Sequence, residues 1–441
     1  MSDSEHNNIT GSTAVEIAAS IEGRVRESRL EFGGRLPTVR GLAADLEVSP
    51  STVAAAYRSL RERGLVTARG RGGTRIAERP PVRSRASPTL PKGVLNLSHG
   101  NPDPELLPPL GPALRTLDPP VRLYAEDMSL PELLEGAREH LFAKRVPTAR
   151  LAVVAGALDG IERVLNANLL RGDRVAVEDP AFSGVLDLLH AQGMVPVPVA
   201  IDDSGLLPEA LQAVLASGVD ALILTPRAQN PTGAALTTAR VRDLRAVLER
   251  HPGVLVIEDD HAGPVAGVPA QTLCSRDRER WAVVASVSKS LGPDLRLAVL
   301  AGDAVTVGRV DGRQLLGIRW VSHVLQRLVV ALWVQRGMQK KLAHAARIYT
   351  ERRRFLIDAL AEHGIRAHGR SGLNVWVPVS EEAELVAALM EAGSAVSAGE
   401  RFRISSPPAL RITTASLRAP QAKRLAAALA GFQRPTRTTP S

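Results

Sequence analysis

Seven short apolar segments, separated by stretches with a helical pattern, dominate the chain from residue 95 to residue 433. They lie at 152–155, 174–177, 195–199, 221–225, 254–258, 282–287 and 297–301. Most are continuous apolar runs, which is typical of strands buried on both faces of a parallel sheet. The segments between them suit crossover helices, so the pattern predicts a doubly wound α/β fold with a seven-stranded, mostly parallel sheet. The stretch from about 305 to 433, with a strand at 374–379, is predicted to form a smaller α+β lobe.

Residues 12–77 show a different pattern, which is typical of a winged helix-turn-helix domain. Three helical stretches come first, and Ser49 followed by Pro50 is a favourable start for the third. Two short strands, at 65–68 and 74–77, then flank a glycine-rich turn. In domains of this plan the third helix enters the major groove of DNA by its N-terminal end.

Positive charge is concentrated at and after the end of this first domain. Residues 57–92 hold ten Lys or Arg and two acidic residues, and so carry nearly all of the net charge of +9. Such a stretch is compatible with a polyanionic partner, and equally with a solvated surface and a linker. Its last part, at 78–94, is rich in proline and arginine and predicts an extended linker to the α/β region at 95–433.

The expected contacts with double-stranded DNA are hydroxyl and arginine side chains. Hydroxyls in the first turn of the third helix, together with its N–H groups, can bind phosphates. An arginine of the preceding helix is placed to reach a guanine edge or a phosphate, and two arginines of the turn between the strands could enter a minor groove. These residues are Arg40, Ser49, Ser51, Thr52, Arg69 and Arg71.

The α/β region carries polar side chains at the ends of its predicted strands. Lys289, which follows Ser286-Val287-Ser288, can form a Schiff base with an aldehyde cofactor. Those hydroxyls and Arg296 can bind the phosphate of such a cofactor, and the turn at 155–158 offers the N–H groups of a helix N-terminus. Asp259 ends another strand, where a buried carboxylate can keep a pyridine nitrogen protonated.

Two further side chains complete the candidate site. Asn230 follows a strand and can bond a phenolic oxygen, and Phe182 can stack on a ring. Taken singly, each residue has an ordinary structural reading: a solvated lysine, a helix cap, a core aromatic. Their order at the ends of successive strands favours one site, because open α/β sheets bind ligands along that edge.

These motifs resemble known families. The stretch LPTVRGLAADLEVSPSTVAAAYRSLRERGLVTARGRGGT resembles the GntR family of bacterial regulators. Residues 95–430 resemble fold-type I pyridoxal-phosphate enzymes of the aspartate aminotransferase family. The whole architecture, with HGNPDPELLP, TPRAQNPTG and SVSKSLGPDLR, is similar to the MocR subfamily, which joins this winged helix to an aminotransferase-like dimer.

The resemblance implies pyridoxal 5'-phosphate as the cofactor and assigns a role to each candidate. Lys289 would be the Schiff-base lysine, Asp259 the partner of the pyridine nitrogen and Asn230 the partner of the phenolate. The phosphate would be bound by Ser286, Ser288, Arg296 and the backbone of Ala157 and Leu158. Tyr124 would reach the phosphate of the neighbouring subunit in a homodimer, and Arg411 would bind the α-carboxylate of a substrate or effector.

The chain departs from these families at three positions. His261 stands where a tyrosine usually follows the Asp-Asp pair. Imidazole could replace the hydrogen bond of the phenol but titrates near neutrality, and it could also turn away from the ring. Efficient transamination is therefore not expected. Pro50 and Ala54 stand where basic residues are frequent, so fewer direct base contacts are expected.

The sequence thus predicts a pyridoxal-phosphate-dependent bacterial transcription regulator. It would bind an operator with two half-sites as a homodimer and respond to an amine, an amino acid or the cofactor itself. The alternative is an active, slow aminotransferase with an accessory N-terminal domain. A single cysteine, no metal-ligand spacing, no signal peptide and no apolar run near the ~20 residues of a membrane span predict a cytoplasmic protein without metal or membrane partner.

Overall fold

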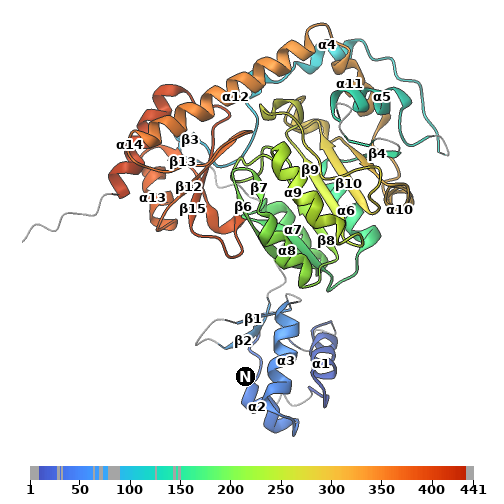
Figure 1. Ribbon diagram of the computed structural model, residues 1–441, viewed down its shortest axis with the longest axis vertical. Helices are drawn as coiled ribbons and strands as arrows, with labels where there is room; N and C mark the ends of the chain where they lie inside the picture. Colours follow the sequence, from blue (N-terminus) through green and yellow to red (C-terminus); the bar gives the residue numbers. More distant parts are fainter. Residues whose placement is uncertain are drawn as a thin grey trace, which may run out of the picture. The chain divides into compact units, whose positions relative to one another are not determined.

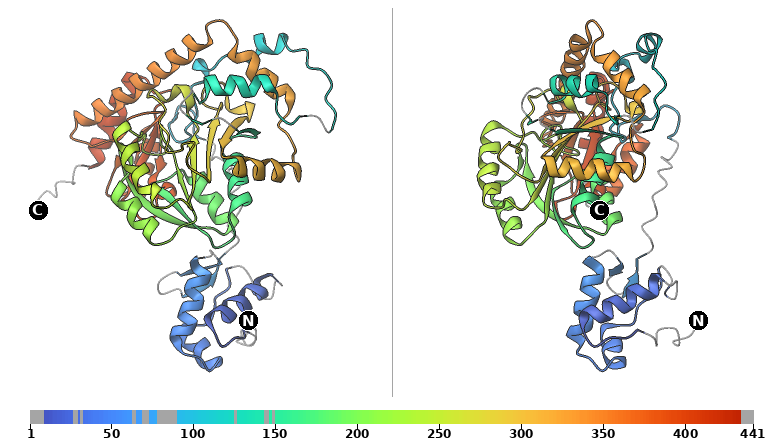
Figure 2. Two further views of the ribbon diagram at one scale, coloured as in Figure 1. Left: turned by 45° about the vertical axis from the view of Figure 1, so that its right-hand side comes forward. Right: turned by 90° about the vertical axis from the view of Figure 1, so that its right-hand side faces the viewer.

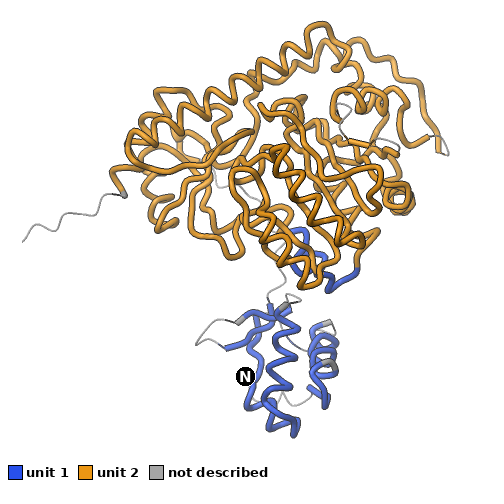
Figure 3. The backbone as a smooth tube through the Cα atoms, viewed as in Figure 1, with its two compact units in different colours: residues 1–89, 170–173, 187–195 blue, residues 90–169, 174–186, 196–441 orange. Residues whose placement is uncertain are grey.

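The computed structural model (Figure 1) describes residues 9–26, 30, 33–62, 65–68, 73–77, 90–124, 127–142, 146–147 and 150–433. Its chain forms two compact units, coloured separately in Figure 3. The first comprises residues 1–89 together with the short segments 170–173 and 187–195, and the second comprises the rest.

The N-terminal unit contains the predicted winged helix-turn-helix. Its elements are α1 (Ala14–Arg26), α2 (Val39–Asp45), α3 (Pro50–Glu62), β1 (Val66–Ala68) and β2 (Thr74–Ile76). The two strands pair antiparallel, and Ile17, Ile21, Leu42, Val53 and Leu60 form much of the core. The helix starts arise from local hydrogen bonds, because Thr38 accepts from the N–H of Gly41 and Ser49 from that of Thr52.

The central sheet, which apart from Val195 belongs to the second unit, contains all seven predicted strands. They are β4 (Arg150–Val154), β5 (Arg174–Asp179), β6 (Val195–Asp202), β8 (Ala221–Leu224), β9 (Leu255–Asp260), β10 (Trp281–Ser286) and β11 (Ala298–Gly302). A two-residue strand, β7 (Gly205–Leu206), extends one edge, and the order is β4-β11-β10-β9-β8-β5-β6-β7. The sheet is mixed, because β11 runs antiparallel to both β10 and β4.

Helices lie on both sides of this sheet, as the views in Figure 2 show. The α-helices between residues 110 and 333 are α4 (Leu110–Arg115), α5 (Pro131–His140), α6 (Ala157–Asn168), α7 (Ser183–Gln192), α8 (Pro208–Ala216), α9 (Thr238–Glu249), α10 (Ala304–Leu315) and α11 (His323–Trp333). The strands β8, β9 and β10 are buried on both faces, which is why they read as continuous apolar runs rather than alternating ones.

The smaller lobe begins later than the sequence pattern predicts. It contains a sheet of β12 (Asn374–Pro378), β15 (Ala409–Thr413) and β14 (Ser397–Ala398), a pair of β3 (Leu95–Asn96) with β13 (Ser394–Ala395), and the helices α13 (Ala383–Glu391) and α14 (Ala419–Gln433). The predicted start near residue 305 is wrong, because Val321, Leu328 and Leu332 pack into the core of the large lobe.

The long helix α12 (Met338–Ala361) belongs to both lobes. Its first half places Leu342 and Tyr349 in the core of the large lobe. Its second half places Leu356 and Leu360 in the core of the small lobe, where Leu97 also packs. Among the described residues, no helix is both long and apolar enough to traverse a lipid bilayer.

Candidate cofactor site and DNA-binding surface

The register of the central sheet brings four strand ends to one edge. Ser286 at the end of β10 pairs with Ala298 of β11, which in turn pairs with Val154 at the end of β4. Asp259, near the end of β9, pairs with Val284. The turn after β4, the run after β10 and the carboxylate of β9 are therefore neighbours, although they are far apart in the sequence.

Lys289 lies just beyond β10, and its ammonium group is half-buried among charged neighbours. Its Nζ donates a hydrogen bond to the carbonyl oxygen of Gly100 at 2.7 Å. Burial and, to a lesser extent, the positive charge of Arg411 together lower the pKa of Lys289 to about 8, although the carboxylate of Asp259 acts to raise it. Because this pKa lies close to neutrality, part of the population carries the free amine that attack on an aldehyde requires.

Asp259 is 4% exposed, and its Oδ1 has no hydrogen-bond partner. Burial raises the pKa of this carboxyl to about 7, with the neighbouring Asp260 adding to the rise and Lys289 opposing it. The ring Nδ1 of His261 lies 3.8 Å from Asp259 Oδ2. The structure thus groups Asp259, His261 and Lys289, as the strand-end pattern predicts.

The turn after β4 is shaped around Arg296. Gly156 has a φ of 104°, and a Cβ atom there would lie 2.6 Å from Arg296 Nη2. The guanidinium donates from Nη2 to the carbonyl of Ala155 at 3.2 Å. Ala157 and Leu158 open α6, so their N–H groups lie at its positive end. On the same sheet edge, the hydroxyl of Ser286 bonds that of Ser288 at 3.1 Å.

Arg411 and Asn230 meet where the small lobe contacts the large one. Arg411 Nη1 donates to Asn230 Oδ1 at 3.3 Å, and Nη2 bonds the carbonyl of Ser98. The guanidinium also lies over the ring of Phe402, 4.7 Å from its centroid. Burial lowers the pKa of Arg411 to about 10, and its Nε is buried without a partner.

The two aromatic candidates have different surroundings. A Cβ on Gly184 would lie 2.7 Å from the Phe182 ring and 3.1 Å from Leu158, so Phe182 packs beside the first turn of α6. Tyr124 is 77% exposed and makes an edge contact with Trp320, with Arg319 stacked 5.3 Å from its centroid. No described contact joins Tyr124 to Lys289, and its expected role toward a second subunit stays a prediction.

Sequence reasoning missed several groups that complete this region. Arg227 forms a buried ion pair with Asp260. The carbonyl groups of Ser98 and Gly100 bond the two cationic side chains of the site. Arg227 stands in the TPRAQNPTG stretch, so its place in that motif could have marked it as a candidate. The two carbonyl groups could not have been predicted, because every residue has one.

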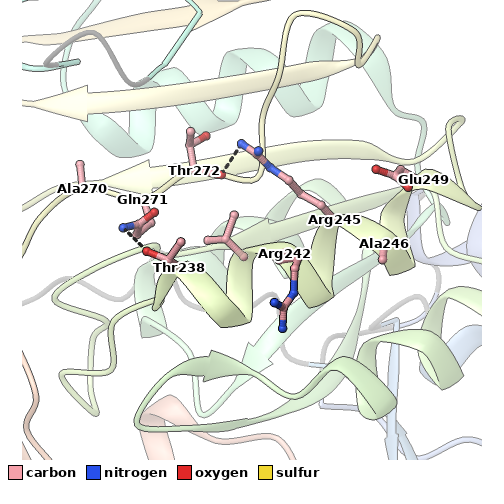
Figure 4. Close-up of a pocket in the computed structure, with 9 residues that line it drawn as sticks. Thr238, Arg242, Arg245, Ala246, Glu249, Ala270, Gln271 and Thr272 are labelled. Carbon is pink, nitrogen blue, oxygen red and sulfur yellow. Dashed lines mark hydrogen bonds between the residues drawn. The ribbon is translucent and has the colours of Figure 1, made fainter.

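A separate hollow follows α9 on the large lobe, shown in Figure 4. Its lining includes Arg242, Arg245 and Thr272, and none of the cofactor candidates. Arg245 is already bonded to the carbonyls of Thr272 and Cys274. In Figure 4 Arg242 points away from Arg245, so the two guanidinium groups do not converge on one ligand position.

On the winged helix, the hydroxyl candidates form one cluster at the start of α3. Ser49 Oγ lies 2.7 Å from Ser51 Oγ and 2.8 Å from Thr52 Oγ1. Arg40 is exposed on α2. Arg69 and Arg71 lie outside the described residues, so their predicted place at the wing stays a prediction.

Two family models match this chain. Residues 13–76 match the bacterial regulatory proteins of the gntR family, and residues 92–429 match aminotransferase class I and II. The second match covers most of the chain.

Curated relatives share both parts. The chain is 40% identical over 423 residues to the vitamin B6 salvage pathway transcriptional repressor PtsJ of Salmonella typhimurium, which covers 95% of this chain and 98% of that protein. It is 27% identical to the pyridoxine biosynthesis transcriptional regulator PdxR of Corynebacterium glutamicum, over 80% of this chain and 79% of that protein. Among solved structures, the α-aminoadipate aminotransferase LysN of Thermus thermophilus superimposes with a TM-score of 0.68 at 24% identity, covering 77% of this chain and 93% of LysN.

Proposed function

The chain belongs to the GntR regulators fused to an aminotransferase class I and II domain, the MocR type, and we propose that pyridoxal 5'-phosphate binds at Lys289 and controls DNA binding. The observation that carries this proposal is the buried Oδ1 of Asp259, which has no hydrogen-bond partner. Leaving such an acceptor unsatisfied costs about 1–3 kcal/mol, so a donor from a ligand is expected there. A protonated pyridine nitrogen is such a donor.

The remaining candidate residues fit the other chemical groups of pyridoxal 5'-phosphate. An amine with a lowered pKa suits its aldehyde, and a guanidinium beside hydroxyls and a helix N-terminus suits its phosphate. An amide suits its phenolic oxygen, and an aromatic side chain suits its ring face. The residues proposed for these roles are Lys289, Arg296, Ser286, Ser288, Ala157, Leu158, Asn230 and Phe182.

When bound, this cofactor supplies an aldehyde for covalent attachment and a ring that accepts electrons. Lys289 acts as the nucleophile, helped by the pKa of about 8 that burial gives it. Asp259 holds a proton at the ring nitrogen by hydrogen bonding and by its charge. Arg296 orients the phosphate end, held in place by its bond to the carbonyl of Ala155.

His261 is neutral at physiological pH in this environment, because burial lowers its pKa to about 4. Desolvation thus places the pKa of His261 below the neutral range that is typical of a free imidazole. A neutral imidazole can make a hydrogen bond at Asp259 but carries no proton to donate as a cationic acid. We propose cofactor binding and sensing as the role of the site, and nothing observed favours the alternative of an active aminotransferase.

The relatives suggest which signal is sensed. Two are named for vitamin B6 salvage and for pyridoxine biosynthesis. We propose that the cofactor itself is the signal and that the regulated genes belong to vitamin B6 metabolism. An amino acid is a second candidate effector, because the buried and unpartnered Nε of Arg411 suits a carboxylate.

For the DNA complex, we propose that the first turn of α3 and Arg40 face the duplex. The hydroxyls of Ser51 and Thr52 both bond that of Ser49. If these bonds break on DNA binding, the two hydroxyls can donate to phosphates instead. A homodimer would present two winged helices to two half-sites, as a cytoplasmic regulator. The large lobe exposes apolar side chains suited to such a dimer interface, namely Val121, Tyr124, Leu316 and Ile318.

A DNA-binding titration tests the proposal. The probe is duplex DNA from the region upstream of the protein's own gene, with a random duplex of equal length as the control. Anisotropy should show preference for the upstream duplex and an affinity that changes when pyridoxal phosphate is added. Binding that shows no preference in either state would overturn the assumption that this upstream region contains an operator of the protein, and failure to bind any DNA at low salt would overturn the role of the winged helix.

A further inference from the structure

A buried ion pair without an assigned role lies behind the proposed cofactor site. Arg227 Nε donates to Asp260 Oδ1 at 2.9 Å, and Nη2 donates to Oδ2 at 2.7 Å. Both side chains are 8% exposed. The N–H of Gly263 also donates to Asp260, and Arg227 Nη1 donates to the carbonyl of Val268. The pair is thus bidentate and embedded in backbone hydrogen bonds.

The pleat of β9 separates this pair from the cofactor residues. Successive side chains of a strand point to opposite faces of the sheet. Asp259 pairs with Val284, which faces α6, because a Cβ on Gly160 of that helix would touch Val284. Asp260 pairs with Ala285, which belongs to the core that includes α9. Arg227 therefore binds Asp260 on the face turned away from Asp259.

The charge of Asp260 nevertheless raises the pKa of Asp259, because the two carboxylates belong to adjacent residues and both are buried at the end of β9. The titratable groups close enough to influence the charge of Asp259 are Asp260 on β9, His261 after it, Lys289 after β10 and Glu178 on β5. Burial raises the pKa of Glu178 to about 8 and lowers that of His261 to about 4, so both are neutral near pH 7. The charges that remain are the attraction of Lys289 and the repulsion of Asp260.

We infer that Arg227 is a positioning residue for the cofactor: it neutralises Asp260 so that Asp259 can stay ionised against the ring nitrogen. The inference rests on the proposed pyridoxal-phosphate site. Two adjacent buried carboxylates without a counter-ion disfavour charge on each other. Arg227 supplies that counter-ion from the face of the sheet turned away from Asp259.

The test compares the directions in which two single substitutions change the affinity for pyridoxal phosphate. Arg227→Ala leaves Asp260 uncompensated, so the dissociation constant for pyridoxal phosphate should rise about tenfold, the equivalent of one unit in the pKa of Asp259. Asp260→Asn removes the repulsion and leaves the cation, so affinity should stay equal or increase. The double variant Arg227→Ala/Asp260→Asn should return to within about threefold of wild type, since no uncompensated carboxylate remains.

Each protein is titrated in its cofactor-free form by visible absorbance, and its thermal midpoint is measured without cofactor. Arg242→Ala, an exposed arginine on α9, is the control and should leave the affinity unchanged. A purely structural ion pair predicts the reverse pattern, in which both single variants and the double variant lose affinity together with thermal stability. That pattern, or an unchanged affinity in Arg227→Ala, would overturn the inference.

Two further outcomes are informative. If Arg227→Ala fails to fold, the sign of the Asp260→Asn effect decides, and a loss of affinity there contradicts charge compensation. If wild type binds no pyridoxal phosphate, the proposed function fails first, and this inference falls with it. A wild type that binds, with variants that do not differ, overturns the inference alone.

Discussion

The winged helix and the proposed cofactor site of this protein are specified by the sequence in different ways. The hydroxyl cluster of α3 comes from four consecutive residues, 49–52, which also start the helix. The proposed cofactor site draws Gly156, Asp259, Lys289 and Arg411 from separate strands and loops, and sheet register brings most of them together. The hydroxyl cluster is formed by neighbouring residues and is exposed, whereas the proposed cofactor site is formed by residues far apart in the sequence and is buried.

This difference predicts how each site responds to substitution. An exposed side chain such as Arg40 contributes to binding without supporting the core, so its loss should leave stability intact. A buried group such as Asp259 is coupled to charged neighbours, so its loss should change both ligand affinity and the pH dependence of folding. Substitutions in the two regions therefore test the comparison separately.

The largest effect is expected at Lys289. Lys289→Ala removes the amine that attaches the cofactor, so reduction with borohydride followed by mass spectrometry should find one cofactor per wild-type chain and none in the variant. The cofactor-free variant should be at least as stable as wild type, because the buried ammonium carries a desolvation cost that lowers its pKa. Lys340→Ala, an exposed lysine on α12, is the control and should retain attachment. Attachment that persists in Lys289→Ala would contradict the assignment.

Gly156→Ala should weaken both cofactor binding and folding. The substitution forces a side chain into a φ of 104° and against Arg296, and each such strain costs about 1–3 kcal/mol. Chemical denaturation and a cofactor titration measure the two losses. Gly253→Ala is the matched control, since a Cβ there meets nothing within 4 Å. Equal behaviour of the two variants would show that the turn does not hold Arg296.

Arg40→Ala should weaken DNA binding and leave folding unchanged. A bidentate base contact is worth about 1–3 kcal/mol, and its loss should relax preference at one position of the operator. Anisotropy against operator variants measures this, with Arg242→Ala on the large lobe as the control for lost charge. A thermal midpoint that falls with the affinity would mean that Arg40 supports the domain instead of the contact.

The smallest effect concerns pH. The pKa of His261 is lowered to about 4, whereas a histidine in the unfolded chain titrates near 6.5. Between these values the unfolded state binds the extra proton, so the contribution of His261 to stability is present above pH 6.5 and is lost as the pH falls toward 4. Replacing it with glutamine should therefore flatten the acid side of the stability profile, an effect that is absent at neutral pH and grows as the pH falls below 6.5. An imidazole that titrates above pH 6 by NMR would contradict this.

Much of the fold could be predicted because the signals are local. Continuous apolar runs located all seven large-lobe strands, and Ser49 with Pro50 located the start of α3. The boundary of the small lobe could not be predicted, because the apolar stripe of a helix such as α11 does not reveal which core it joins. Helical periodicity shows that one face of a helix is buried, but only tertiary packing determines which core that face contacts.

The proximity of the candidate residues was also predictable in part, whereas their binding of a cofactor stays a prediction. Lys289, Asp259 and His261 stand at strand ends, and the shared edge of an α/β sheet brings such residues together. The ion pair of Arg227 with Asp260 spans 33 residues and follows from the pleat of β9, which no motif encodes. The links from Ser98 and Gly100 to the two cations are made by backbone carbonyls, and any residue supplies those.

The central claim, that occupancy at Lys289 controls DNA binding, is tested most directly by one joint titration. Pyridoxal phosphate is added to the protein in the presence of labelled upstream DNA, and cofactor absorbance and DNA anisotropy are recorded on the same sample. The account predicts that both signals change with the same midpoint in wild type, and that anisotropy stays constant in Lys289→Ala. A cofactor signal that saturates while the DNA affinity of wild type does not change would contradict it.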